Sequence, residues 1–354
     1  MRVAVLWTGL SGYMNACLKE LAGREGVELF VSHEAQKTVA PFDERQFAWM
    51  QNRLVWRTFA DLNSLDQRLQ DFSPEIVVLP SWHITPYRRA AKLLAGKCWR
   101  VMIMDNCWRA TVKQRIGTWI APYFVRPIAD VAWIPGERQA VFAKRLGFAQ
   151  RAILRGSFSC DQDAFDAAYR ARKAEQRGAP RAFLFVGRLA PEKGVDVLVK
   201  AYAQYRSKAK DPWPLICCGT GPMQPILEGQ AGIRVEGFVQ PDQMPAMMAS
   251  AGCLVLPSVF EPWALVVHEA TSAGLAVLAS DKVGAAVHLV QPEYNGYIFD
   301  PKDVDALAGL MLRMSAMDDR QLGAMSEASH LLSRQYSPRM WADVLLRSVE
   351  KQHK

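Results

Sequence analysis

The sequence predicts an α/β fold with two doubly wound, Rossmann-like domains. In the first half, strand-like runs at residues 2–7 and 27–31 alternate with a helix-like run at 13–21, and this alternation predicts a parallel sheet covered by helices. A second alternation begins at residues 183–186. Between the two, residues 160–179 become charged and rich in alanine, as is typical of a domain boundary.

The individual elements follow from short apolar runs bounded by turn formers and from apolar residues at helical spacing. We expect further strands at residues 75–79, 100–104, 215–218, 233–235, 253–256 and 276–278, and helices at 87–94, 164–174, 264–273 and 338–349. The first domain is then expected at residues 1–160 and the second at 161–337, facing a central cleft. The tail 338–354 is expected to pack back on the first domain, since Trp341 and Leu345 share one helical face.

Composition fits a soluble globular protein, with 354 residues, 50% hydrophobic and 22% charged. The apolar start at residues 3–7 is too short for a signal peptide, and no apolar run approaches the roughly 18 residues of a spanning helix. We therefore expect a cytoplasmic protein. Seven cysteines without a C-x-x-C pair indicate reduced core residues rather than a disulfide framework.

Positive charge is concentrated in the first half of the chain. Residues 1–170 carry 23 Lys/Arg against 16 Asp/Glu, and nine of these basic residues lie between Arg88 and Arg126 with Asp105 as the one acid among them. Trp99, Trp108, Trp119, Tyr123 and Phe124 are interleaved with them. This mixture favours an anionic membrane surface or a solvated basic face about equally. No recognised nucleic-acid motif accompanies it, so a nucleic-acid partner is not expected.

Two cations and a set of glycines follow the first strands of the second domain. Arg188 comes just after the strand at 183–186, and Lys193 stands at the start of the next helix, so both approach one helix amino terminus. That concentration of positive potential suits a phosphate-bearing ligand. Gly219 and Gly221 follow the next strand in a Gly-x-Gly-Pro turn, where backbone can approach a ligand closely.

Two glutamates follow a later strand of the same domain. Glu261 is predicted on the loop after the strand at 253–256, and Glu269 in the second turn of the helix at 264–273. Both could face one crevice at the carboxyl edge of the sheet, where doubly wound folds bind ligands. Such a pair suits a polyhydroxylated, anionic ligand.

The ordered set Gly-Arg-x4-Lys-Gly, Gly-x-Gly-Pro and Glu-x7-Glu resembles the donor-sugar domain of the retaining glycosyltransferases of family four, which have the GT-B architecture. The resemblance is strong over residues 183–300. In weaker form it reaches Gly9 and Gly12, which are similar to the glycine-rich loop that these enzymes place against the donor, and residues 294–300, which resemble their late turn.

The resemblance implies a role for each residue of the set. Arg188 and Lys193 would hold the donor diphosphate, Glu269 would accept hydrogen bonds from ribose hydroxyls, and Glu261 would contact sugar hydroxyls as a binding group. The catalytic candidates are Arg188, Lys193, Glu261 and Asp105, and the donor-binding candidates are Gly9, Gly12, Gly187, Gly219, Gly221, Phe238, Ala264, Leu265, Val266 and Glu269.

The chain also departs from the family pattern. Ala264 stands where the family commonly has glycine, and His288 stands where it commonly has glutamate. Many members carry a cleft histidine near the transferring carbon, whereas the matching strand end here contains Asp105. Asp105 and His83 are the two candidates for that place.

No metal or cofactor is expected beside the donor substrate. Two D-x-D sequences, at residues 161–163 and 303–305, match the pattern by which the other large glycosyltransferase architecture binds a divalent cation. Neither follows a strand of the right kind, and Asp161 precedes a helical run, which predicts a helix start.

The sequence thus predicts a retaining hexosyltransferase of polysaccharide biosynthesis. It would move a sugar from a nucleotide-diphosphate sugar, with UDP-sugar as first choice, to a glycan or lipid-linked glycan at the cytoplasmic face of a membrane. Two alternatives stay open: a non-catalytic sugar-nucleotide-binding module that recruits partners, and a sugar-nucleotide epimerase or hydrolase.

Overall fold

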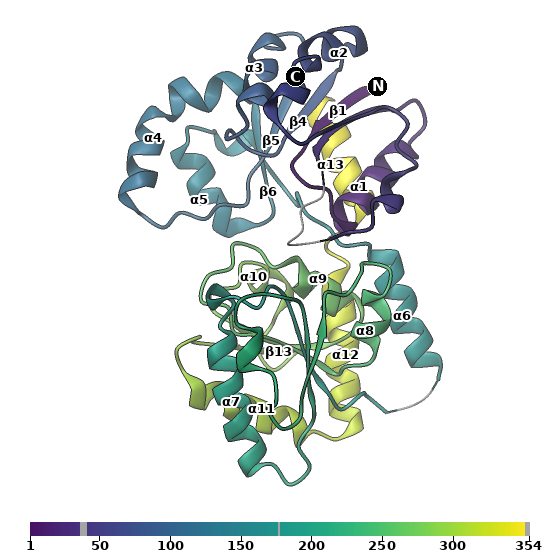
Figure 1. Ribbon diagram of the computed structural model, residues 1–354, viewed down its shortest axis with the longest axis vertical. Coiled ribbons are helices and arrows are strands. Elements are labelled where there is room, and N and C mark those ends of the chain that lie inside the picture. The colour runs from purple at the N-terminus through teal and green to yellow at the C-terminus, as the bar shows by residue number, and fades with distance from the viewer. Residues whose placement is uncertain (36–40, 176–177, 351–354) are drawn as a thin grey trace. The chain divides into compact units, whose positions relative to one another are not determined.

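The computed structural model describes residues 1–35, 41–175 and 178–350 and divides into two compact units (Figure 1). Unit 1 comprises Met1–Ser159 together with Pro338–Lys354, and unit 2 comprises Cys160–Ser337. Each unit contains a sheet with only parallel pairings among its described strands. The prediction of two doubly wound α/β domains is confirmed.

Unit 1 is built on a seven-stranded sheet in the order β3-β2-β1-β4-β5-β6-β7. Its strands are β1 (Arg2–Leu6), β2 (Glu28–Glu34), β3 (Arg53–Trp56), β4 (Ile76–Leu79), β5 (Trp99–Ile103), β6 (Val131–Ile134) and β7 (Ile153–Arg155). Its helices are α1 (Gly12–Ala22), α2 (Leu65–Phe72), α3 (Thr85–Leu93), α4 (Val112–Phe124), α5 (Glu137–Arg145) and α13 (Pro338–Glu350), with short 3₁₀ turns η1 (Glu44–Phe47), η2 (Phe59–Leu62), η3 (Arg126–Ile128) and η4 (Gln150–Ala152).

The central strands of unit 1 bury both faces, as expected of a parallel sheet with helices on each side. In β1, Val3 and Val5 belong to the core layer that includes helices α1 and α13. Ala4 and Leu6 belong to the layer that includes α3. The strands therefore need apolar residues at consecutive positions, which explains their continuous apolar runs.

The carboxyl-terminal helix α13 packs on unit 1. Trp341 lies 4.8 Å from Trp133 between ring centroids and donates its indole N–H to the Ser157 carbonyl at 2.9 Å. Its Leu345 is fully buried in the same core layer as α1. The helix thus covers one face of the sheet that the first half of the chain forms.

Unit 2 is built on a six-stranded sheet in the order β10-β9-β8-β11-β12-β13. Its strands are β8 (Phe183–Val186), β9 (Leu215–Cys218), β10 (Ile233–Gly237), β11 (Cys253–Leu256), β12 (Ala276–Ser280) and β13 (Gly296–Phe299). Its helices are α6 (Gln162–Ala174), α7 (Val195–Lys208), α8 (Met244–Ala249), α9 (Leu265–Ser272), α10 (Ala286–Leu289), α11 (Val304–Ser315) and α12 (Asp319–Ser333), with 3₁₀ turns η5 (Pro191–Lys193) and η6 (Gln224–Ile226).

One face of the unit 2 sheet packs against α7 and α11. Phe183 and Phe185 of β8 are fully buried there beside Tyr205 of α7 and Met311 of α11. Helices α9 and α12 pack against each other and against β12. This packing fixes the loops at the carboxyl ends of β8, β9 and β11, where the predicted site residues lie.

The structure contains no disulfide framework among its cysteines, and its described helices are too short or too polar to span a bilayer. All seven cysteines are free, and all except Cys107 are buried. Burial raises the pKa of Cys217 and Cys218 to about 12, so these thiols stay protonated. Among the described residues, no helix is both long and apolar enough to span a bilayer.

Candidate functional site

The candidate site lies where the strand order of unit 2 reverses. From β8 the chain proceeds to β9 and β10 on one side, and it then crosses to β11 on the other. In a doubly wound sheet this switch point opens a crevice outside the carboxyl ends of the two adjacent strands, which is where ligands bind. Arg188 and Lys193 follow β8, and Glu261 follows β11. The structure therefore brings these predicted residues to the two sides of one switch point.

Lys193 and Glu261 form an ion pair across that point. Their side chains are mostly buried, with exposed fractions of 20% for Lys193 and 10% for Glu261. An ammonium has three donors and a carboxylate about four acceptor positions, so the pair leaves hydrogen-bonding capacity on both partners. A ligand with an anionic group and hydroxyls could use both.

Arg188 is the more exposed cation of the site. Its guanidinium forms an ion pair with Glu192, four residues further along the chain, and 57% of its side chain is exposed. Glu192 also accepts a backbone hydrogen bond from Val259 at 3.0 Å, which ties the turn after β8 to the loop after β11. Arg188 is therefore held at the rim of the switch point, with guanidinium surface free for an anion.

The glycines predicted at the site allow the loops after β8 and β9 to pack backbone to backbone. A Cβ at Gly219 would lie 1.9 Å from the Gly187 carbonyl oxygen, and a Cβ at Gly221 would lie 2.3 Å from the Leu189 carbonyl oxygen. Hydrogen bonds from Gly187 to Cys218 and from Leu189 to Thr220, both 2.9 Å, connect the same loops. Neither position could hold a larger residue without moving the turn that presents Arg188.

Two further glycines hold the loop that carries Glu261. At Gly194, φ is +68° and a Cβ would lie 2.1 Å from the Pro257 carbonyl oxygen. A Cβ at Gly284 would lie 1.9 Å from the Pro262 carbonyl oxygen, and Gly284 donates to the Glu261 carbonyl at 3.0 Å. Gly284 is not among the predicted site residues, whereas Gly194 is the last residue of the Gly-Arg-x4-Lys-Gly motif but has no predicted role of its own.

Helix α9 begins beside this loop, with Ala264 as its N-cap. The N–H groups of Leu265 and Val266 belong to the first turn, which has no partners within the helix and carries the positive end of the helix dipole. The predicted donor-binding run 264–266 is thus the amino terminus of α9. Phe238, another predicted donor residue, follows β10 and is partly buried.

Ala264 adopts a left-handed backbone conformation, with φ 74° and ψ 78°. This region costs a residue with a Cβ roughly 1–2 kcal/mol, whereas glycine enters it freely. The sequence departure at this position therefore has a conformational consequence as well as the addition of a methyl group. His288, the other departure, lies in α10 with its ring 5.9 Å from that of Trp263.

Replacing Ala264 with glycine is expected to raise the free energy of unfolding by up to about 1 kcal/mol or to leave it unchanged. Relief of the left-handed strain at least offsets the larger conformational entropy that glycine gains on unfolding. Ala273→Gly is the matched control, since Ala273 caps the other end of α9 with φ −79°. It is expected to destabilise. Urea unfolding of the three proteins tests this. Equal destabilisation by the two substitutions would contradict it.

Glu269 projects from the second turn of α9, as predicted. Its carboxylate accepts no hydrogen bond from the described residues, and its side chain is partly buried. This burial raises the pKa of Glu269 to about 7. A carboxylate that is desolvated and unpartnered is poised to accept hydrogen bonds from a ligand, which would replace the lost water.

His268 fixes α9 in place. Its Nδ1 accepts a hydrogen bond from the Cys160 N–H at 3.1 Å, so its Nε2 must carry the proton that is donated to the Ser333 carbonyl at 3.0 Å. Burial lowers the pKa of His268 to about 4, which keeps the ring neutral. The ring thus holds α9 to the first residue of unit 2 and to the end of α12, and thereby positions Glu269.

The remaining predicted residues belong to unit 1. Gly9 follows β1, Gly12 opens α1, and Asp105 follows β5. Burial, together with the nearby charge of Asp105, raises the pKa of the Tyr13 hydroxyl, so Asp105 lies close to the start of α1. His83 follows β4 and is exposed, with its ring 5.3 Å from that of Trp82. These four residues lie at the carboxyl edge of the unit 1 sheet.

The two D-x-D sequences begin helices. Asp161 accepts a hydrogen bond from the Ala164 N–H at the start of α6, and Asp303 accepts one from the Ala306 N–H at 2.8 Å at the start of α11. Such N-caps satisfy helix donors that lack partners. Over residues 1–35, 41–175 and 178–350, no cluster of metal-ligating side chains is found.

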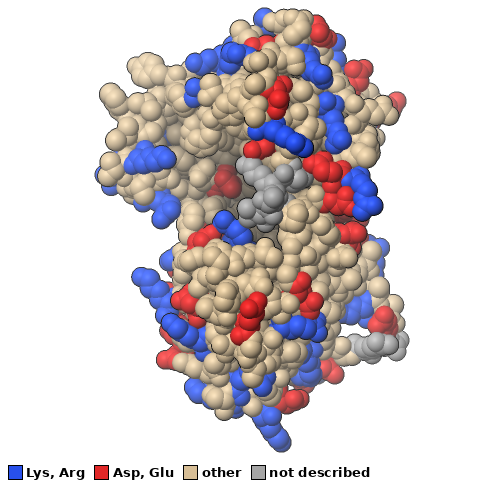
Figure 2. Space-filling view, in the orientation of Figure 1, with Lys and Arg blue, Asp and Glu red and all other residues tan. Residues whose placement is uncertain are grey.

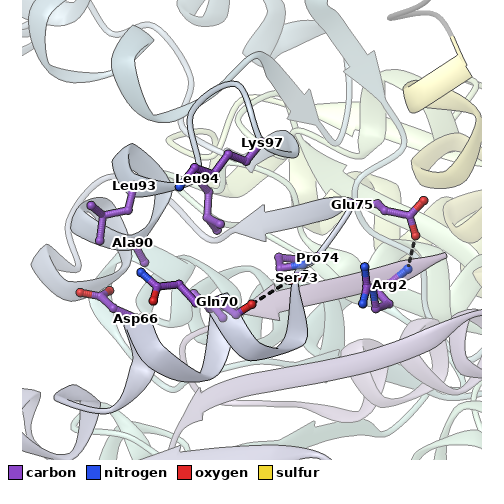
Figure 3. A pocket seen from close by; sticks show the side chains of 11 residues that line it. Arg2, Asp66, Gln70, Ser73, Pro74, Glu75, Ala90, Leu93, Leu94 and Lys97 are labelled. Atoms are coloured by element: carbon purple, nitrogen blue, oxygen red, sulfur yellow. Dashed lines mark hydrogen bonds between the residues drawn. The ribbon is translucent and has the colours of Figure 1, made fainter.

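A pocket of about 400 Å³ lies at the opposite edge of the unit 1 sheet (Figure 3). It is lined by α2, α3 and the amino ends of β1 and β4, with Leu94 and Gln70 among its walls. The Arg2 N–H donates to the Glu75 carboxylate at 2.7 Å at its side. None of the predicted site residues lines it.

Comparison with known proteins identifies a domain in this chain. Residues 169–329, which carry β8 to β13 and the switch point, match the family described as Glycosyl transferases group 1. An uncharacterised glycosyltransferase of Methanocaldococcus jannaschii is 36% identical over 137 residues, which cover 36% of this chain and 34% of that protein. Alpha-D-kanosaminyltransferase of Streptomyces kanamyceticus is 26% identical over 223 residues, which cover 60% of this chain and 57% of that protein.

The whole architecture also has a solved counterpart. HepE of Anabaena, determined in complex with UDP, superposes with a TM-score of 0.75 over 99% of this chain and 100% of that chain, at 15% sequence identity. The two Rossmann-like parallel-sheet units therefore have the GT-B architecture. The chain spans about a third to little more than half of the two relatives above, 34% and 57% of their lengths.

Proposed function

We propose, from the group 1 glycosyl transferase domain at residues 169–329, that this chain is a retaining glycosyltransferase. It would transfer a hexose from a nucleotide-diphosphate sugar to a glycan or lipid-linked glycan acceptor. The observation that carries the proposal is the Lys193–Glu261 pair at the β8/β11 switch point. A cation for phosphate and an acceptor for sugar hydroxyls meet there in a partly buried site.

The residues of unit 2 suit the charge that develops during transfer. When the bond between the sugar C1 and the diphosphate oxygen breaks, negative charge grows on the leaving phosphate. Lys193, Arg188 and the α9 N–H groups are fixed positive charges and dipoles that stabilise this charge more than the ground state. Glu261 and Glu269 would accept hydrogen bonds from the sugar and ribose hydroxyls, which fixes the orientation of C1.

Retention of configuration would place the acceptor on the face that the phosphate leaves. The acceptor oxygen forms a bond to C1, and its proton passes to an oxygen of the leaving diphosphate. This route needs no protein carboxylate as nucleophile, in agreement with binding roles for Glu261 and Glu269. Asp105 and His83, at the carboxyl edge of the unit 1 sheet, are the unit 1 residues to test for a role in transfer.

The choice of donor and the location of the reaction belong to the same proposal. HepE was determined in complex with UDP, which makes UDP-sugars the first donors to test. The acceptor would be presented at the cytoplasmic face of a membrane, where the protein would act peripherally in polysaccharide biosynthesis. The basic, aromatic segment 88–126 supports this location.

A donor screen tests the function. Thermal shift with UDP-, GDP- and ADP-sugars should show stabilisation by one nucleotide class, and the donor so found should be hydrolysed slowly without acceptor. Analysis of the released sugar by NMR should show retained configuration. Binding without any turnover would favour the non-catalytic module instead. Release of an isomeric sugar nucleotide would favour an epimerase, and failure of every donor to bind would refute the proposal.

A further inference from the structure

Helix α4 exposes an apolar face that no described residue of unit 1 covers. Ala121 is its one fully buried residue, and the opposite face is turned to solvent. Trp119 and Tyr123 are 81% and 83% exposed. The other exposed apolar residues of the helix are Val112, Ile116 and Ile120. Spacings of three and four place the five on one stripe, and a stripe of this size is unusual on a soluble monomer.

The charged residues that flank this stripe along the chain are all positive. Residues 106–129 contain four basic residues, Arg109, Lys113, Arg115 and Arg126, and no acid. Lys113 and Arg115 are exposed on α4 itself. In Figure 2, the surface over α4, at the left edge of the picture, shows tan and blue atoms without red.

Three other cations of the basic segment 88–126 are engaged within unit 1. Arg100 is buried and forms an ion pair with Asp130 at 2.7 Å, and Arg89 forms one with Asp66 at 2.8 Å. The Arg88 guanidinium lies 4.2 Å from the centre of the Phe124 ring. These cations serve the fold, so the segment is not one uniform basic face. Lys92 and Lys97 are also exposed, but on α4 exposed cations lie beside the five-residue apolar stripe.

We propose that α4 is the membrane-docking element of this protein and binds a bilayer surface that contains anionic phospholipid. Trp and Tyr rings suit the headgroup depth, the aliphatic residues enter the acyl boundary, and the cations meet lipid phosphates. An anionic bilayer accounts for both the apolar stripe and the cations beside it. An acidic groove on a protein would account for the cations but would not need the apolar stripe. The inference deepens the proposed transfer at a membrane face, and its test does not depend on donor chemistry.

Vesicle flotation of the full chain tests the inference. Binding is expected to vesicles of phosphatidylcholine with phosphatidylglycerol, to be much weaker to phosphatidylcholine alone, and to fall as salt is raised. Ile116→Glu should weaken binding about tenfold or more by placing a charge in the stripe. Leu331→Glu in α12 is the matched control, since it makes the same charge change at a residue of similar exposure, 51% against 57% for Ile116.

A second pair of variants tests the electrostatic part. Lys113→Gln with Arg115→Gln removes two charges beside the stripe, and each should weaken binding about fivefold. The control is Lys200→Gln with Arg320→Gln, two exposed residues of unit 2. Nucleotide-sugar binding, measured without vesicles, should be the same in all four variants and the parent, so a failed function and a failed docking site are distinguishable.

Three results would overturn the inference. One is equal flotation with neutral and anionic vesicles, and another is equal flotation of Ile116→Glu and the parent. The third is a parent that self-associates through α4, seen as a concentration-dependent mass that Ile116→Glu abolishes. That outcome would assign the stripe to a second copy of the chain.

Discussion

Replacing Lys193 with alanine is expected to lower the rate of sugar transfer by about 10²- to 10³-fold, as loss of a preorganised transition-state donor does in other enzymes. The expected effect is on kcat, because in the proposed reaction the ammonium of Lys193 would interact most strongly with the charge that the leaving phosphate gains as the glycosyl bond breaks. Steady-state kinetics with the donor found by thermal shift measures it. Lys200→Ala, which removes an exposed lysine from the following helix α7, is the charge-matched control.

Lys193→Ala should also lower folding stability, and this effect must be separated from the loss of transfer rate. Glu261 is 10% exposed and forms its ion pair with Lys193, so Lys193→Ala leaves a desolvated carboxylate without its cation. Breaking a buried pair costs about 3–5 kcal/mol, and this partly buried pair should cost less. The double variant Lys193→Ala with Glu261→Ala should regain part of that stability and remain inactive. Recovery of transfer in the double variant would contradict the assignment.

A substitution at Arg188 tests the same stabilisation of the leaving phosphate with less effect on folding stability. Its pair with Glu192 is largely exposed, and exposed pairs contribute about 0–1 kcal/mol. Arg188→Ala should therefore keep the stability of the parent while it loses transfer. If the Arg188→Ala variant transferred sugar as well as the parent, the assignment of Arg188 to the functional site would be wrong.

Most central strands of the two sheets could be predicted from the sequence because they are apolar at consecutive positions and buried on both faces, whereas the strands at 53–56, 131–134, 153–155 and 296–299 were not expected. Residues 253–256 are all apolar and bounded by turn formers, and they form β11 as expected. The switch point then follows, since the position of Arg188 after β8 and of Glu261 after β11 needs only the strand order of a doubly wound sheet. The local pattern was sufficient for this part of the site.

The remainder of the site depends on contacts between residues far apart in the chain. Nothing next to Gly284 predicts that its missing Cβ makes room for the Pro262 carbonyl, and nothing in the order of residues predicts the left-handed backbone of Ala264. The basic segment 88–126 shows the same limit. Composition alone does not distinguish the nine basic residues of this segment. In the structure, Arg100 is buried against Asp130 and Lys113 is exposed on α4.

Replacing Glu269 with glutamine is expected to stabilise the protein at pH 8 while it weakens donor binding. The pKa of Glu269 is raised from 4.5 to about 7 by burial, so folding must desolvate an ionised carboxylate at high pH. This penalty is absent below pH 4.5, grows as the pH rises, and is complete above about pH 7. Because the side chain is partly exposed, the gain for Glu269→Gln at pH 8 should be about 1–3 kcal/mol.

Urea unfolding from pH 5 to pH 8 measures this difference, which should shrink toward pH 5. Glu327→Gln is the control, because Glu327 is an acid on α12 with 62% of its side chain exposed, and its change should stay within about 0.5 kcal/mol at every pH. A stability difference between Glu269→Gln and the parent that does not vary with pH would contradict the prediction.

Although Glu269→Gln should raise the stability of the free protein, it should lower the affinity for the donor. An ionised carboxylate accepts hydrogen bonds from two hydroxyls, whereas an amide offers one acceptor oxygen, so Glu269→Gln should weaken donor binding about 10- to 100-fold. The parent should bind donor more tightly as the pH rises through 7, and calorimetry at pH 6 should detect release of a proton on binding. The variant should show neither effect. In the proposed complex, the hydroxyls of the donor would supply the hydrogen bonds that the Glu269 carboxylate lacks in the free protein.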